Sequence, residues 1–168
     1  MAAPCFIAWN SASVNLSSAI SGTSLSTTTP TTLLQLKTGA NKVRLIEVGW
    51  SFSTTPSAPV RMEVFEAGNS GFATVTSVTP TLYNDATGAA SAAVSSTTAT
   101  GYSATAEGTI PTTGCRLLVQ SWDSGPWHSQ AFPLGREPEI QSGYGLRIRA
   151  TAPTSSALVI LCYAIWEE

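Results

Sequence analysis

The sequence predicts an all-β protein, a single domain built as a sandwich or barrel of about eight to ten short antiparallel strands. Short runs of β-branched and aromatic residues alternate along the chain with turns rich in Gly, Pro, Ser and Thr. No stretch shows the 3.6-residue periodicity of an amphipathic helix. With 168 residues, the chain is long enough for one hydrophobic core and short for two domains.

The last apolar run, residues 157–166 with the sequence ALVILCYAIW, has no polar break. Successive side chains of a strand point to opposite faces. One face receives Leu158, Ile160 and Cys162, and the other receives Val159, Leu161, Tyr163 and Ile165. Both faces are therefore predicted to be dry. In an antiparallel fold, such a strand needs a second cover, from a sheet on each side or from a neighbouring subunit.

The first third of the chain predicts three or four strands. Residues 1–12 are apolar and uncharged and form either an N-terminal arm or a first strand, ahead of a main domain over residues 13–168. The Ser- and Thr-rich residues 13–32 suit one edge strand and a long turn, and residues 33–37 form a short strand. Over residues 42–53 the apolar alternation changes phase, which predicts a β-bulge near Leu45 and Ile46. Gly49 is expected to give the indole of Trp50 its room.

The rest of the chain predicts further short strands around one long irregular segment. Residues 60–64 alternate cleanly between apolar and charged side chains, and strands over residues 72–78 and 81–83 follow. Residues 84–113 are rich in Ala, Ser, Thr and Gly and predict an extended surface excursion with one weak strand at most. Residues 116–122, 127–132 and 146–150 complete the set before the terminal run.

Composition excludes several classes of function. Charged residues make up 11% of the chain, against about 25% in typical soluble domains, and the formal net charge is -2. The eight Lys and Arg residues are scattered, so no nucleic-acid partner is predicted. No apolar run reaches the roughly 18 residues of a membrane span, and no signal peptide is evident, which predicts no membrane partner and a cytosolic or particle-bound protein.

No catalytic or cofactor site is predicted. Asp123, His128 and Ser129 are close in sequence, but a hydrolase triad is assembled from separated elements and usually has a GxSxG elbow, which is missing. Glu137 and Glu139 are expected to lie on a solvated loop. One histidine and three dispersed cysteines suit neither a metal site nor a disulfide framework. The expectation is a protein that is not an enzyme and holds no cofactor and no metal.

Two weaker patterns suggest binding. Trp122, Trp127 and Tyr144 could stack on sugar rings, although core packing or a subunit contact is the more common use of such residues. Arg147 and Arg149 place two cations on one strand face, where they could meet acidic groups of a partner or the Glu167 and Glu168 end of a neighbouring subunit.

Residues 132–168 carry a family resemblance. The run FPLGREPEI, then GYGLRIRATAP and the apolar strand ending in IWEE, resembles small all-β proteins encoded in structural gene clusters of actinobacterial tailed phages. The likeness extends in outline to LLQL and KVRLIEVGWSFS. The resemblance implies a single jelly roll with trimeric organisation like that of tumour necrosis factor, used as a capsid decoration or cement protein.

This resemblance and the terminal strand together predict a homotrimer on a capsid. The expected trimer-interface residues are Trp50, Phe52, Tyr163, Ile165 and Trp166. The expected capsid-contact residues are Phe6, Ile7 and Trp9. The partners would be further copies of the chain and the major capsid protein, on the outer surface of a virion assembled in the host cytoplasm. The alternative is a receptor- or glycan-binding jelly-roll module of a phage tail or capsid surface.

Overall fold

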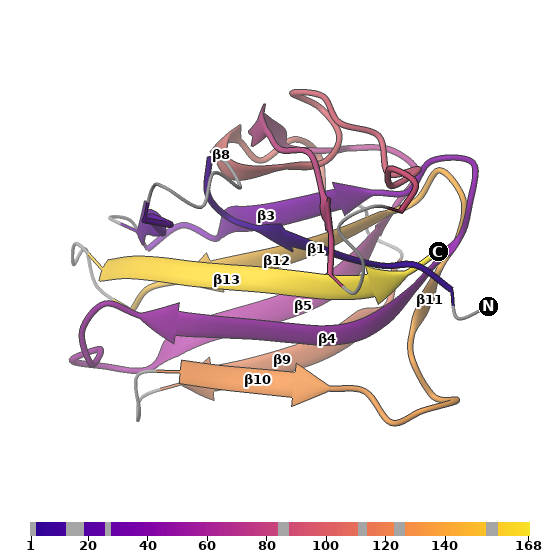
Figure 1. Cartoon of the computed structure of the whole chain (residues 1–168). Helices are drawn as coiled ribbons and strands as arrows, with labels where there is room; N and C mark the ends of the chain where they lie inside the picture. Colours follow the sequence, from indigo (N-terminus) through magenta and orange to yellow (C-terminus); the bar gives the residue numbers. More distant parts are fainter. Residues whose placement is uncertain are drawn as a thin grey trace.

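The chain folds into two antiparallel sheets packed face to face, a β-sandwich, in the computed structural model (Figure 1). The structure describes residues 3–12, 19–25, 28–83, 88–110, 114–122, 127–153 and 158–168, and of Trp122 only the backbone. These residues form strands and no helix. The strands are β1 (Cys5–Trp9), β2 (Thr23–Leu25), β3 (Thr31–Lys37), β4 (Val43–Phe52), β5 (Val60–Gly68), β6 (Thr74–Ser77), β7 (Thr81–Leu82), β8 (Gly101–Ala106), β9 (Arg116–Trp122), β10 (Trp127–Ala131), β11 (Glu139–Ile140), β12 (Gly145–Thr151) and β13 (Leu158–Glu167).

The order of the strands is that of a jelly roll. Sheet A runs β10-β4-β13-β1-β7, with β11 beside β4 and β2 beside β13, and sheet B runs β6-β8-β3-β12-β5-β9. Eight strands make the frame: β1, β3, β4, β5, β9, β10, β12 and β13. When these eight strands are numbered from one to eight along the chain, their spatial order is 6-3-8-1 in sheet A and 2-7-4-5 in sheet B, which is the order of a jelly roll. The prediction of an all-β jelly-roll sandwich is confirmed.

The core lies between the two sheets and accounts for the apolar alternation of the strands. Val48 and Trp50 of β4 and Ile160 of β13 face it from sheet A, and Leu36 and Met62 face it from sheet B. The predicted bulge is present: Ile165 pairs with Glu47 and Trp166 with Leu45, so Ile46 is the extra residue of β4. This extra residue keeps both Leu45 and Val48 pointing into the core.

The Ser- and Thr-rich middle of the chain closes one side of the sandwich. It leaves β5, adds β6 and β8 to the β3 edge of sheet B and β7 to the β1 edge of sheet A, and returns to β9 (Figure 1). Buried Gln35 anchors it, with its Nε2 donating to Ala99 O at 2.5 Å and its Oε1 accepting from Ala73 N at 2.9 Å. The one weak strand allowed for residues 84–113 is β8; residues 84–87 and 111–113 are outside the described part.

The described end of residues 1–12 is a strand in the sheet. β1 pairs with β13 along its length, from Cys5 opposite Glu167 to Trp9 opposite Tyr163, and with β7 on its other side. Of the two alternatives, arm or first strand, the structure has the strand. The first and last strands of the chain consequently lie side by side (Figure 1).

Candidate functional site

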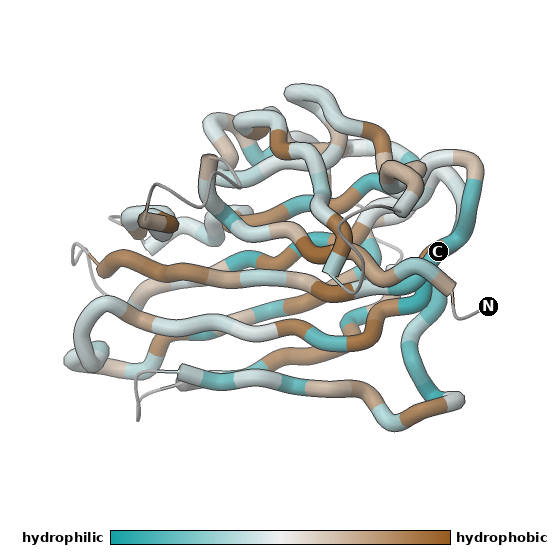
Figure 2. Tube along the Cα trace, in the orientation of Figure 1, coloured by the Kyte–Doolittle hydropathy of each residue, from teal (hydrophilic) through white to brown (hydrophobic). Residues whose placement is uncertain are grey.

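The outer face of sheet A, the face turned away from the core, is the candidate site. Strand alternation places on the central part of this face the following residues: Ile7 and Trp9 of β1, Glu47, Gly49 and Ser51 of β4, Trp127 and Ser129 of β10, and Val159, Leu161, Tyr163 and Ile165 of β13. At one end of the face the pattern continues with the charged residues Arg44 of β4, Glu139 of β11 and Glu167 of β13. Most of the central side chains are apolar or aromatic, and the chain's longest apolar strand crosses the middle of the face (Figure 2). An antiparallel sheet whose outer face meets water normally presents polar side chains there.

Within a single chain, only one face of the terminal strand β13 is shielded from water. Leu158, Ile160 and Cys162 are buried against sheet B, as their alternation predicts. On the outer side, Val159 is 36% exposed, and Leu161 and Tyr163 are only half-buried. Within one chain, the sandwich supplies one cover, and no described segment supplies the second along this part of the strand. The second cover from a neighbouring subunit stays a prediction.

Tyr163 lies at the centre of the face, over a glycine. A Cβ on Gly49 would come within 2.4 Å of the Tyr163 ring, so Gly49 makes room for this ring rather than for Trp50 on the other side of the sheet. The Tyr163 hydroxyl donates a short hydrogen bond to Glu47 Oε1. Burial, followed by the contact with Glu47, raises the pKa of Tyr163 well above its ordinary value, so the phenol stays protonated and donates this bond.

Beside Tyr163 the face has a shallow hollow with an aromatic rim. Its volume is about 240 Å³, and its lining includes Trp9, Ser51, Trp127, Leu161 and Tyr163. The Trp9 and Tyr163 rings are 4.9 Å apart between centroids, at an interplanar angle of 46°. Trp127 stands at the edge strand with 66% of its surface exposed, which is unusual for an indole in a folded domain. The hollow could receive an apolar or ring-shaped group.

Three of the residues expected at the trimer interface are in the core instead. Trp50, Phe52 and Trp166 are buried between the sheets and belong to the core cluster, so they present no surface to a neighbour. The other two, Tyr163 and Ile165, lie on the outer face, although Ile165 is already 95% covered by its own chain, with 5% exposed. The interface expectation is corrected for the three core residues.

The expected capsid-contact residues are also divided between the two sides of sheet A. Phe6 is buried in the core, 6.2 Å from the ring of Trp166, and cannot touch a capsid. Ile7 and Trp9 are half-buried on the outer face, in register with Ile165 and Tyr163. The capsid-contact expectation is corrected for Phe6, because β1 is a paired strand and not an arm.

The aromatic residues of the alternative do not form one site. Trp127 pairs with Ser51 near one end of β4, whereas the segment that leads to Tyr144 pairs with Val43 near the other end. Tyr144 packs against the core cluster, and the side chain of Trp122 lies outside the described part. The hollow instead groups Trp127 with Trp9 and Tyr163, two residues that are remote from it in sequence.

The catalytic candidates do not converge. His128 and Ser129 are neighbours on β10, so alternation directs them to opposite faces: His128 stacks on Trp50 at 4.6 Å, and Ser129 lies on the outer face. Burial lowers the pKa of His128. Asp123 is outside the described residues. In the described part of the chain, no group of three or more His, Cys, Asp or Glu side chains is placed to hold a metal ion.

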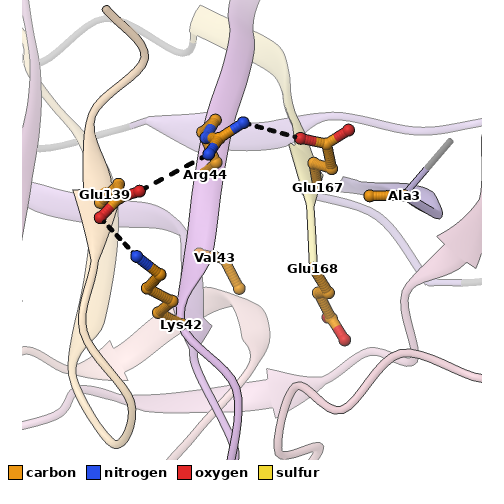
Figure 3. Close-up of a pocket in the computed structure, with 7 residues that line it drawn as sticks. All are labelled: Ala3, Lys42, Val43, Arg44, Glu139, Glu167 and Glu168. Atoms are coloured by element: carbon orange, nitrogen blue, oxygen red, sulfur yellow. Dashed lines mark hydrogen bonds and ion pairs between the residues drawn. The ribbon is translucent and has the colours of Figure 1, made fainter. Parts of the chain in front are cut away.

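A second hollow, also of about 240 Å³, lies where the two ends of the chain meet (Figure 3). Glu139 binds Lys42 at 2.9 Å and Arg44 at 3.7 Å, and Arg44 reaches Glu167 at 3.2 Å. Glu168 turns away from this chain of ion pairs, and its Oε1 accepts from Trp166 Nε1 at 3.0 Å. The charged side chains that line this hollow are paired with one another. They therefore suit a role in holding the ends of the strands together rather than a catalytic role.

The fold and the face together define a jelly-roll sandwich with one mainly apolar sheet face that its own chain covers only in part. No family model matches the chain, and neither the curated proteins nor the solved structures contain a significant match to it. The described residues contain no helix long and apolar enough to cross a membrane.

Proposed function

We propose that this protein is a structural protein of a tailed-phage virion, a homotrimer that decorates the outer surface of the capsid and stabilises it. The observation that carries the proposal is the outer face of sheet A, where Trp9, Leu161, Tyr163 and Val159 are left partly open on a sheet of an otherwise well-packed domain. An apolar cluster that stays partly open on one face of a sheet suggests a surface for contact with another molecule. The resemblance of residues 132–168 to phage decoration proteins favours three copies and the capsid as the place.

Association through this face follows from its chemistry. Fully burying one large apolar side chain contributes about 1.5 to 3 kcal/mol, and the half-covered residues on the face retain part of that gain for a neighbour. The carboxylate beside Tyr163, Glu47, already accepts the Tyr163 hydroxyl, so it keeps a hydrogen bond when water is removed. Ile7 and Trp9, first expected to meet the capsid, belong in this proposal to the subunit contact.

The contact between subunits is tested by light scattering with a matched pair of variants. Leu161→Glu places a charge in the centre of the face, and Val119→Glu places one at a valine that is 44% exposed on β9 of the opposite sheet. We expect the wild type and Val119→Glu to be trimers at micromolar concentration and Leu161→Glu to be a folded monomer. A wild-type monomer at that concentration would refute the trimer.

The capsid role is tested on particles. A protein that binds only the assembled shell stabilises it by its binding free energy. Purified capsids incubated with the chain should carry density at threefold or quasi-threefold positions in cryo-microscopy maps and should rupture at a higher temperature than bare capsids. Maps without such density would reject decoration even if the trimer were established.

A second candidate function rests on the exposed indole of Trp127. If the hollow binds a sugar ring, Trp127→Ala should abolish glycan binding and leave the oligomeric state unchanged. The decoration proposal instead expects that neither the wild type nor Trp127→Ala binds glycans. Screening of the wild type against immobilised neutral and acidic oligosaccharides separates the two.

A further inference from the structure

Half of the chain's cations gather on the outer face of sheet B. Of eight Lys and Arg residues, Arg61, Arg116, Arg147 and Arg149 lie there, on β5, β9 and β12. The ladder makes them neighbours: Arg149 pairs with Glu63, and both Arg116 and Arg147 pair with Phe65. In sequence they are up to 88 residues apart, from position 61 to position 149, so the scatter in the sequence hid a cluster in the fold.

The cluster carries more positive than negative charge. Glu63 accepts from Arg149 at 2.6 Å and from Arg61 at 3.0 Å and lies 3.5 Å from Arg116, and Glu107 lies 3.9 Å from Arg147. Four guanidinium groups therefore face two carboxylates in these pairs, which leaves an excess of two positive charges on a chain of net charge -2.

The excess charge is accessible on one side of the cluster. The side chains of Arg147 and Arg149 are 0% and 11% exposed, whereas those of Arg61 and Arg116 are 53% and 64% exposed. Arg61 and Arg116 also share a single oxygen of Glu63, each through one nitrogen, so most of their five N–H donors are not used in these contacts. These two arginines can bind a further carboxylate without breaking the buried pair beneath them.

The free edge of β9 indicates what kind of molecule brings that carboxylate. β9 is the last strand of sheet B, and no described strand pairs with its other side. Such an edge presents backbone N–H and C=O groups to an incoming strand. Arg116 and the 44% exposed Val119 lie on the same strand, and Arg61 lies one strand further in, opposite Ser121. A peptide chain can use both the backbone edge and the arginines, whereas a polysaccharide or polyphosphate can use only the charges.

We propose that Arg61, Arg116 and the free edge of β9 form a docking site for an extended acidic segment of a partner protein. The segment adds a strand beside β9 and places carboxylates at alternate positions, next to Arg116 and across the small Ser121 to Arg61. This site is on the opposite sheet from the proposed subunit contact, so it does not depend on the trimer. On a particle, the partner that meets it would be the shell protein.

The test uses the full-length protein and a peptide of alternating glutamate and threonine residues, with binding followed by calorimetry at low and physiological salt. The variant is R61Q/R116Q, and the control is K42Q/R136Q, which removes the same charge from exposed residues elsewhere. We expect the affinity to fall at least tenfold in R61Q/R116Q and less than twofold in the control, and to weaken as salt rises. Amide hydrogen exchange along β9 should slow when the peptide is bound.

Other outcomes would overturn the proposal. These are no binding of the peptide at low salt, equal losses in the two double variants, or bound peptide without protection of β9. A peptide with the same composition but its glutamates in one block, and inorganic polyphosphate, serve as competitors of matched charge. If either binds as tightly as the alternating peptide, the face is a general anion site and not a strand-docking site. Thermal unfolding of both double variants confirms that they are folded, since Glu63 keeps its pair with Arg149 in each.

Discussion

Glu63→Gln is the substitution with the sharpest expected effect on stability. The Glu63 side chain is 2% exposed, and its Oε2 accepts a 2.6 Å hydrogen bond from Arg149 Nε. Arg149 is itself almost buried, with its guanidinium 4.7 Å from the centre of the Phe65 ring. Glutamine keeps the shape of the side chain but leaves this guanidinium without its counter-charge, because the other groups around Glu63 are the cations Arg61 and Arg116.

The magnitude follows from burial. Removing one partner of a buried ion pair costs about 3 to 5 kcal/mol, because the remaining charge is left desolvated. Arg61 and Arg116 keep access to water, so we expect the lower end, about 3 kcal/mol. The matched control is Glu139→Gln, whose pairs with Lys42 and Arg44 involve side chains 38% to 59% exposed. Exposed pairs contribute about 1 kcal/mol or less.

The assay is urea unfolding of the two variants and the wild type at neutral pH and one fixed protein concentration, since association also contributes to stability. In thermal unfolding of a domain of this size, the same loss of about 3 kcal/mol would lower Tm by roughly 6 to 12 °C. Equal destabilisation by Glu63→Gln and Glu139→Gln would refute the reasoning, because it would mean that burial of the pair does not decide its contribution.

The same pair predicts an acid-dependent part of the stability. Burial alone would raise the pKa of Glu63, but the hydrogen bond from Arg149 and the charges of Arg149, Arg61 and Arg116 outweigh it and lower the pKa. A carboxyl whose pKa is lower folded than unfolded stabilises the fold above its unfolded pKa, and this contribution is lost as the pH falls through the folded pKa. The gap in stability between wild type and Glu63→Gln should therefore narrow below about pH 4. If the difference in stability between wild type and Glu63→Gln stayed constant from neutral pH to pH 3, the ion pair of Glu63 with Arg149 would not be its source.

Three further substitutions test the core, the outer face and the excursion. Gly49→Ala should push the Tyr163 ring off its site and lower stability by roughly 1 to 3 kcal/mol in urea unfolding, because the added Cβ would lie 2.4 Å from that ring. Trp166→Ala should cost about 3 to 5 kcal/mol of unfolding free energy while trimers persist wherever the protein is folded, because this side chain fills the core. Gln35→Leu should speed amide exchange from residue 73 to residue 100, since two backbone groups of the excursion lose their partner.

Most of the fold could be predicted from the alternation of apolar and polar residues along the strands. Alternation and turn signals placed the frame strands, and the phase change near Leu45 and Ile46 located the bulge, because an extra residue must shift the inward-facing set. The two-residue strand β11 was missed, since Glu139 and Ile140 have no periodicity to detect and are held by pairing with β4. Local sequence contains little information about such a strand.

The candidate site was only partly predictable, for a different physical reason. Alternation shows which side chains share a face, but it does not show which face is the inner one when both are apolar. Trp50 and Phe52 were therefore assigned to a surface, although they line the core. Tyr163 does lie on the outer side, where a subunit contact is possible, but its fit over Gly49 depends on strand register between distant segments. The arginine cluster depends on register in the same way.

The two outer faces of the sandwich differ in how far the chain itself covers them. On sheet B, the excursion lies over part of the outer face and is tied down by buried polar groups, among them Arg147, whose Nη1 donates to Glu107 O at 3.0 Å. Buried charges are tolerated on that face because the same chain supplies their hydrogen-bond and ion-pair partners. On sheet A, the described chain covers the centre of the outer face only in part, although most of the side chains there are apolar or aromatic. A self-contained domain would place its polar residues on the open face and its apolar residues under the cover. The reverse arrangement is the strongest reason to expect that sheet A meets another copy of the chain.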